Sequence, residues 1–97
     1  MNSSAPSNTG DPEKKDRRYK FVATVWRSGE LTSLNDIFDI IPRSVVAADL
    51  GVNYERFTRK LLKPGGFYFR EIERLSVLLD IPFEELSKLV AITIQNK

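Results

Sequence analysis

The sequence predicts an all-α fold, a compact domain of four or five helices, and three observations support this prediction. Apolar residues recur with helical spacing between residues 34 and 41 and again between residues 69 and 79. The intervening segments contain helix breakers, such as the KPGG sequence at Lys63 to Gly66. The polar segment 1–17 resembles a disordered tail, so residues 18–97, roughly 80 residues, remain to form one small packed domain.

Several classes of function are disfavoured by the composition. The chain of 97 residues has neither cysteine nor histidine, so it lacks thiolate ligands, disulfides and the commonest general base, and we expect no metal site and no cofactor. We also expect no catalytic residues, because exposed pairs such as Asp36 with Asp39 or Glu71 with Glu73 are usually solvated carboxylates. No apolar run is long enough to span a bilayer and no signal-peptide core is present, so a cytoplasmic location is expected.

The first half of the domain contains two predicted helices. In residues 19–28 the stripe Phe21, Val22, Val25 and Trp26 favours a helix and the β-branched content favours a strand; we favour a short helix ended by Gly29. In the second, Ser33 with Asp36 predicts an N-terminal cap for a helix whose apolar face is Leu34, Ile37, Phe38 and Ile41. Pro42 ends that helix, because the residue before a proline avoids helical angles.

The segment Val45 to Leu62 predicts two helices that cross over a tight turn. Ala47 provides a small side chain where the helices meet, and Gly51 suits the left-handed conformation that ends the first of them. Val52 points back to the core, Asn53 caps the second helix, and Phe57 anchors it from its inner face. The second helix is therefore positioned by its neighbours.

Two further helices are predicted beyond the KPGG breaker, after Phe67 folds back onto the core. The stripe Phe69, Ile72, Leu75 and Leu79 defines one helix, which ends near Asp80. Pro82 suits the first turn of the last helix, and Glu84 and Glu85 lie at its positive end. The apolar face of that helix continues through Leu86, Leu89 and Val90.

The spacing AxxxGVxxxxF, together with Leu50 and Leu61, resembles the phage-repressor (Cro/Xre-type) helix-turn-helix family over about residues 33–90. The resemblance implies a lambda-repressor-like fold that binds double-stranded DNA with a recognition helix at about residues 53–62 in the major groove. Arg43 stands where that family often has glutamine, which suggests a phosphate contact, and Lys60 stands where an apolar residue is common. The net charge of +2 is small, but six basic residues and two acidic residues lie between Arg56 and Arg74. This basic segment overlaps the predicted recognition helix.

If Val52, Phe57 and Leu61 face inward, the opposite side of the recognition helix supplies the candidates for base contacts. These candidates are Asn53, Tyr54, Glu55, Thr58 and Arg59. The candidates for phosphate contacts are Arg43, Ser44, Arg56, Lys60 and Lys63.

Each base-contacting candidate has a chemical rationale. Arg59 matches guanine in a bidentate pair, and Asn53 matches adenine unless its oxygen is occupied as a cap. Thr58 suits a thymine methyl group or a phosphate, and Glu55 accepts from cytosine, orients an arginine or offsets the helix dipole. Tyr54 has three candidate roles: its ring would lie against a sugar or stack on an arginine, or its hydroxyl would donate to a phosphate.

Proteins similar to this family usually bind DNA as dimers, so we expect a homodimer, cytoplasmic and nucleoid-associated, of bacterial or phage origin. The dimer interface would use Val25 and Trp26, or Ile92 and Ile94, unless these residues complete the core of one subunit. The alternative function is a protein-binding module of the same fold, an antitoxin or an adaptor, that acts through exposed apolar residues.

Overall fold

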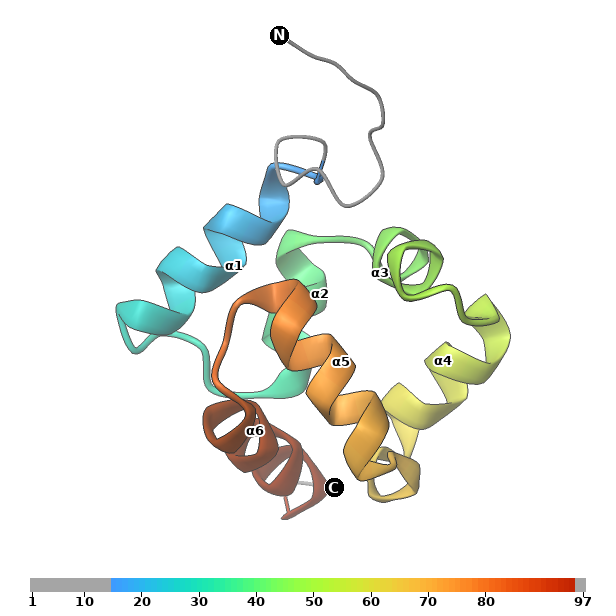
Figure 1. Cartoon of the computed structure of the whole chain (residues 1–97). Coiled ribbons are helices and arrows are strands. Elements are labelled where there is room, and N and C mark those ends of the chain that lie inside the picture. Colours follow the sequence, from blue (N-terminus) through green and yellow to red (C-terminus); the bar gives the residue numbers. More distant parts are fainter. Residues whose placement is uncertain (1–14, 96–97) are drawn as a thin grey trace, which may run out of the picture.

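The computed structural model describes residues 15–95, and within this range it contains α-helices, one short 3₁₀ helix and no strand (Figure 1). The elements in chain order are α1 (Arg18–Arg27), α2 (Leu34–Ile40), α3 (Arg43–Leu50), α4 (Tyr54–Leu62), η2 (Pro64–Gly66), α5 (Phe69–Leu79) and α6 (Phe83–Gln95). The predicted all-α class is confirmed. The described range contains six α-helices, more than the predicted four or five, because each segment expected to be helical, residues 19–28 included, forms a separate helix.

The segment between residues 18 and 27 is a helix, as the favoured interpretation predicted. Tyr19, Val22 and Ala23 are buried, and Gly29 takes a positive φ of 83° after the helix ends. Phe21 does not belong to the inner stripe, because it is 61% exposed. The β-branched residues do not prevent a helix here, because Val22 is buried on the same helical face as Tyr19, three residues earlier.

The predicted tail extends to residue 17, and its last three residues contact the folded part of the chain. Asp16 accepts a hydrogen bond from the Arg18 amide at 2.9 Å and pairs with the Arg18 guanidinium at 2.7 Å, which lowers the pKa of Asp16 to about 2. Lys15 Nζ donates to the Leu78 carbonyl at 3.1 Å. The rest of the predicted tail, residues 1–14, lies outside the described residues.

Helix α5 crosses the centre of the molecule in Figure 1 and contacts α1, α3 and α6. Its buried residues are Ile72, Leu75, Ser76 and Leu79. Phe69 was expected in this stripe but is 78% exposed, although its ring lies 5.6 Å from that of Phe83. Phe69 is the first residue of α5, so the neighbouring helices do not cover it as they cover Leu75.

Helix α6 contacts the start of α2 through the side chain of Thr93. The buried Thr93 hydroxyl accepts a hydrogen bond from the Leu34 amide at 2.9 Å and donates to the Leu89 carbonyl at 2.8 Å. The amide of the first residue of a helix has no partner inside that helix, so a buried one needs an external acceptor. Asp36 serves the same end of α2 by accepting from the amides of Thr32 and Ser33, as the predicted cap required.

Candidate nucleic-acid interface

The turn between α3 and α4 is closed by local hydrogen bonds around Gly51. Gly51 has φ 72° and ψ 32°, its amide donates to the Ala48 carbonyl at 3.1 Å, and the Val52 amide donates to the Ala47 carbonyl at 3.0 Å. This pair of bonds satisfies two of the last four carbonyls of α3, those of Ala47 and Ala48. Ala47 is buried, as expected for the residue where the two helices meet. The local sequence therefore determines the direction in which α4 leaves the turn.

Replacing Gly51 by alanine is expected to lower the free energy of unfolding by about 1–2 kcal/mol, because an L-residue is strained at this φ. A Cβ atom at Gly51 would meet no atom within 4 Å, so the loss would come from the backbone alone. Urea denaturation followed by circular dichroism measures it. Gly66→Ala is the matched control, because a Cβ there also meets nothing and Gly66 has no positive φ. An equal loss in both variants would contradict the role given to Gly51.

A tertiary contact also holds this turn. The guanidinium of Arg74, on α5, donates a hydrogen bond to the Leu50 carbonyl at the end of α3. A cation at the carboxyl-terminal end of a helix also interacts favourably with the helix dipole. The sequence analysis counted Arg74 only as part of a basic group, because its partner lies 24 residues earlier in the chain.

The inner face of α4 is anchored by Phe57 and Leu61, which are both buried. The Phe57 ring packs edge-on against Phe38 at 5.8 Å and against Phe67 at 6.4 Å. These contacts confirm that Phe57 faces inward and that Phe67 folds back onto the core. Helix α4 is therefore fixed in rotation, and the residues on its other side are determined.

The outer side of α4 carries three of the predicted contact residues, and a fourth, Lys63, directly follows the helix. Glu55, Arg59 and Lys63 are exposed, and Tyr54 is 45% exposed. Tyr54 also lines a groove of about 470 Å³ together with Arg43 and Ser44 at the start of α3. The groove brings together one base-contacting candidate and two phosphate-contacting candidates. Asn35 and Asp39 also line the groove. The sequence analysis did not propose them as contact residues, although both are polar positions on the outer side of the predicted helix at 34–41.

Asn53 acts as the cap of α4. Its side-chain oxygen accepts a hydrogen bond from the Arg56 amide at 2.9 Å. A bidentate pair with adenine uses both the oxygen and the amide nitrogen of asparagine. Asn53 would have to give up the cap to form that pair. Of its two predicted roles, capping α4 is the one observed.

Thr58 and Lys60 do not lie on the outer side of α4, which differs from the prediction. The Thr58 hydroxyl is buried and makes no hydrogen bond within residues 15–95. The Lys60 side chain is only 16% exposed, and its ammonium group lies 2.6 Å and 2.5 Å from the two oxygens of Glu71. The ammonium group also lies 4.4 Å from the centre of the Tyr68 ring. Lys60 is therefore a partner of α5 in this structure and not an exposed phosphate ligand.

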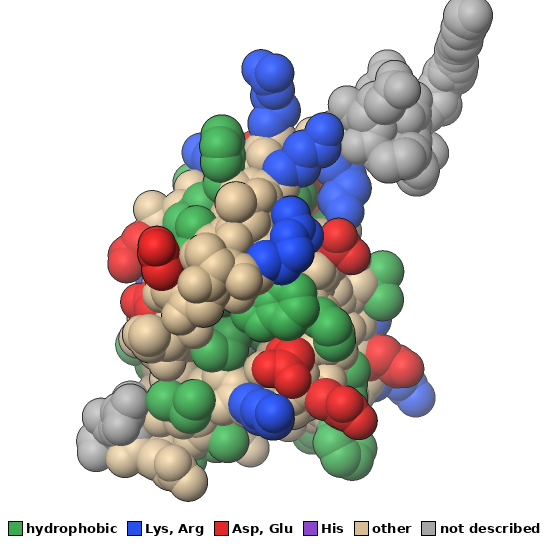
Figure 2. Space-filling view, turned by 90° about the vertical axis from the view of Figure 1, so that its left-hand side faces the viewer, with side chains coloured by type: hydrophobic (Ala, Val, Ile, Leu, Met, Phe, Trp, Pro, Cys, Tyr) green, Lys and Arg blue, Asp and Glu red, His purple; other side chains and the backbone are tan. Residues whose placement is uncertain are grey.

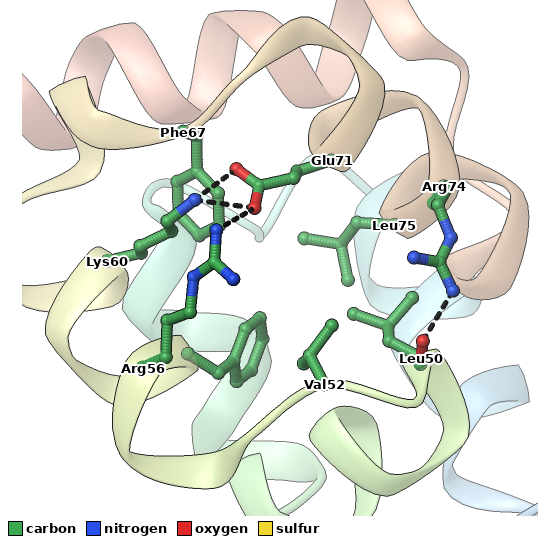
Figure 3. A pocket seen from close by; sticks show the side chains of 9 residues that line it. Leu50, Val52, Arg56, Lys60, Phe67, Glu71, Arg74 and Leu75 are labelled. Carbon is green, nitrogen blue, oxygen red and sulfur yellow. Dashed lines mark hydrogen bonds and ion pairs between the residues drawn. The ribbon is translucent and has the colours of Figure 1, made fainter.

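Glu71 connects α4 to α5, and Figure 3 shows Arg56 and Lys60 both directed at its carboxylate. Arg56 approaches to 4.0 Å, and the Tyr68 amide donates to Glu71 at 2.8 Å. Partial burial opposes ionisation of Glu71, but the hydrogen bonds from Lys60 and Tyr68 outweigh burial and lower the pKa of Glu71 below its usual range. The sequence did not predict this pair, because Lys60 and Glu71 are eleven residues apart on different helices.

We expect the Glu71→Gln variant to lose less stability than the original chain when the solution is acidified. Because the pKa of Glu71 is lower in the folded chain than its ordinary value of 4.5, the ionised group stabilises the fold above that value. This contribution is lost as the pH falls through the lowered folded pKa. Urea midpoints measured from about pH 6 to about pH 2 test it. Parallel curves for the two proteins would contradict the role of Glu71.

A small cavity lies behind the ion pair between α4 and α5 (Figure 3). It has a volume of about 30 Å³ and is lined by side chains that include Leu50, Val52, Phe57 and Leu75. This volume is on the order of one water molecule, so the cavity does not hold an organic ligand. The outer surface of α3 and α4 is therefore a better candidate for a binding site than this interior space.

Comparison of the chain with protein-family models, with curated proteins and with solved structures found no match. No described helix is long and apolar enough to cross a membrane. Among residues 15–95, no three acidic side chains gather closely enough to hold a metal ion. The class that the fold defines is a small all-α domain with consecutive helices, α3 and α4, joined by a glycine turn.

Proposed function

We propose that this protein is a sequence-specific DNA-binding transcriptional regulator that places α4 in the major groove. The observation that carries the proposal is the orientation of α4, whose buried Phe57 and Leu61 turn Tyr54, Glu55 and Arg59 toward the solvent. An α-helix fits the major groove, where side chains can reach the base edges. The proposed role is binding without catalysis, in the cytoplasm.

Three side chains of α4 would contact bases in this proposal. Arg59 is exposed and has no ion-pair partner among the described residues, so its guanidinium is available for the bidentate pair with guanine. Glu55 lies one turn before Arg59 and would accept from cytosine or orient that guanidinium. Tyr54 would lie against the sugar and phosphate at the edge of the groove.

The phosphate contacts would come from both helices of the pair. Arg43 and Ser44 begin α3 and share a groove with Tyr54, whereas Arg56 lies on α4 and Lys63 directly follows it. Arg56 is 58% exposed even though Glu71 lies 4.0 Å away, so it can still reach a phosphate. Lys60 is omitted from this set because of its ion pair. Such contacts make binding weaker as salt concentration rises.

We also propose a homodimer, because one small domain makes few base contacts and two copies double them. Ile92 and Ile94 on α6 are exposed, whereas Val25 and Trp26 pack against the core. The exposed pair on α6 is therefore the better candidate for the interface. Analytical ultracentrifugation of an Ile92→Asp variant tests this choice, and a dimer as stable as that of the original chain would exclude Ile92.

Selection from a randomised duplex DNA pool at about 0.15 M salt is expected to enrich a palindromic site. Arg59→Ala should lose one guanine contact, which costs about 1–3 kcal/mol of discrimination at that base pair. Arg70→Ala is the matched control, because Arg70 is an exposed arginine outside α4. The control should weaken binding to all sequences by a similar, small factor and leave the selected sequence unchanged.

Failure to enrich any sequence, with the fold intact by circular dichroism, would contradict the proposed function. The alternative is then a protein-binding module, an antitoxin or an adaptor. The adjacent exposed side chains of Tyr68 and Phe69 favour this second candidate, because contiguous apolar surface, unlike a single apolar residue, commonly marks a protein contact. Salt separates the two functions, since an apolar interface does not weaken steeply as salt rises.

A further inference from the structure

A groove of about 550 Å³ lies between α1 and the carboxyl-terminal end of α5. The buried residues Tyr19 and Ala23 form part of its lining, and Val77 and Leu78 contribute apolar side chains from α5. Val77 is 75% exposed, so the groove has an uncovered apolar surface. Covering such an apolar surface with a partner would be favourable, because it removes apolar side chains from water.

The same groove is basic. Its lining includes four cations, Lys15, Arg17, Lys20 and Arg27, and two carboxylates, Asp16 and Asp80. Asp16 is held by the Arg18 guanidinium at 2.7 Å, and Lys15 is held by the Leu78 carbonyl. Within residues 15–95 no carboxylate forms an ion pair with Arg17, Lys20 or Arg27, and these three side chains are exposed.

This groove is separate from the proposed DNA interface. In Figure 1, α1 and α4 lie on opposite sides of the molecule, with α5 between them. Figure 2 shows the side of the molecule that carries α1, with Lys and Arg side chains gathered along its upper part. A ligand in the groove would therefore leave Arg59 and its neighbours on α4 accessible.

We propose that this groove docks an acidic amphipathic helix of a partner protein. Carboxylates on one side of such a helix complement Lys20 and Arg27, and apolar side chains on its other side cover Val77. Helix α1 has ten residues and is about 15 Å long, which suits a partner segment of about three turns. The proposal goes beyond DNA binding and does not rest on it.

A nucleic acid fits the groove less well than a peptide. Single strands bind through bases that stack on exposed aromatic rings. The aromatic ring in the lining belongs to Tyr19, which is 4% exposed and whose hydroxyl donates to Asp49 at 2.6 Å. The exposed Val77 side chain also gains nothing from a phosphate backbone. The apolar part of the groove therefore favours a protein partner.

The test is selection of a displayed library of random peptides of about 16 residues, roughly four helical turns, on the full chain. Enriched peptides should carry carboxylates on one helical face and apolar residues on the other. The affinity of one enriched peptide is then measured by fluorescence anisotropy for the original chain and for Lys20→Glu/Arg27→Glu, which should bind about tenfold more weakly. Arg59→Glu/Lys63→Glu, on α4 and directly after it, is the control, since it changes the net charge by the same amount and should bind nearly unchanged.

Three results would overturn the proposal: no acidic amphipathic peptide is enriched, both double variants lose the same affinity, or a single-stranded oligothymidine displaces the peptide at a similar concentration. The last result would assign the groove to nucleic acid. Val77→Asn provides a second variant, which removes the apolar contact without changing the charge of the groove. Because Val77 is largely exposed, this variant should fold like the original chain and still lose affinity for the peptide.

Discussion

Replacing Phe57 by alanine is expected to lower the free energy of unfolding by about 3–5 kcal/mol. The Phe57 ring is 4% exposed and packs against the rings of Phe38 and Phe67. It also borders the existing cavity between α4 and α5, so truncation would enlarge a space that is already unfilled. Because Phe57 fixes the rotation of α4, the variant should also lose the DNA binding that we propose.

Urea denaturation followed by circular dichroism measures this loss, and Tyr54→Ala is the matched control. Tyr54 is another aromatic residue of α4, but it is 45% exposed, so its removal should cost less than about 1 kcal/mol. The control separates the structural role of α4 from its proposed role in binding, because Tyr54→Ala should weaken the proposed DNA binding without unfolding the domain. Similar losses of stability in both variants would show that Phe57 does not anchor α4.

Replacing Thr93 by valine is expected to lower the free energy of unfolding by about 1–3 kcal/mol. Valine has almost the same shape as threonine, so the packing of α6 should change little. The variant lacks the hydroxyl that accepts from the Leu34 amide, and that amide begins α2 in the buried interior. A buried amide without an acceptor keeps its full desolvation cost.

Thr93→Ser and Thr24→Val provide the controls for this prediction, again by urea denaturation. Serine keeps the hydroxyl and loses one methyl group, so it should cost only about 1 kcal/mol. Thr24 is exposed on α1, and its replacement by valine should leave stability nearly unchanged. If Thr93→Ser is as unstable as Thr93→Val, the methyl group and not the hydrogen bond is the source of the stability.

Those features of the candidate interface that depend on a single helix or a single turn could be predicted from the sequence. Gly51 ends α3 in the left-handed conformation, Asn53 caps α4, and Phe57 and Leu61 face inward, as their spacing indicated. Each of these features depends on residues a few positions apart, because caps and helix faces are local properties of the chain. The positions of Arg59 and Glu55 on the outer side of α4 follow from the same periodicity.

The partners of individual side chains could not be predicted in this way. Periodicity indicates that Lys60 lies near the boundary of the inner face of α4, but it cannot indicate that Glu71 on α5 receives its ammonium group. Phe21 and Phe69 are apolar and were expected in the core, yet both are exposed. Their environments depend on which helix packs beside them, and one helical stripe does not contain that information.

The sequence by itself determined that the fold is all-α and which turn joins α3 to α4, because these properties are set by backbone conformation and by neighbours within a few residues. The tertiary structure alone decided that Arg74 holds the turn, that Thr93 caps α2, and that α1 and α5 enclose a basic groove. Each of these joins segments far apart in the chain, so it exists only once the helices have packed against one another.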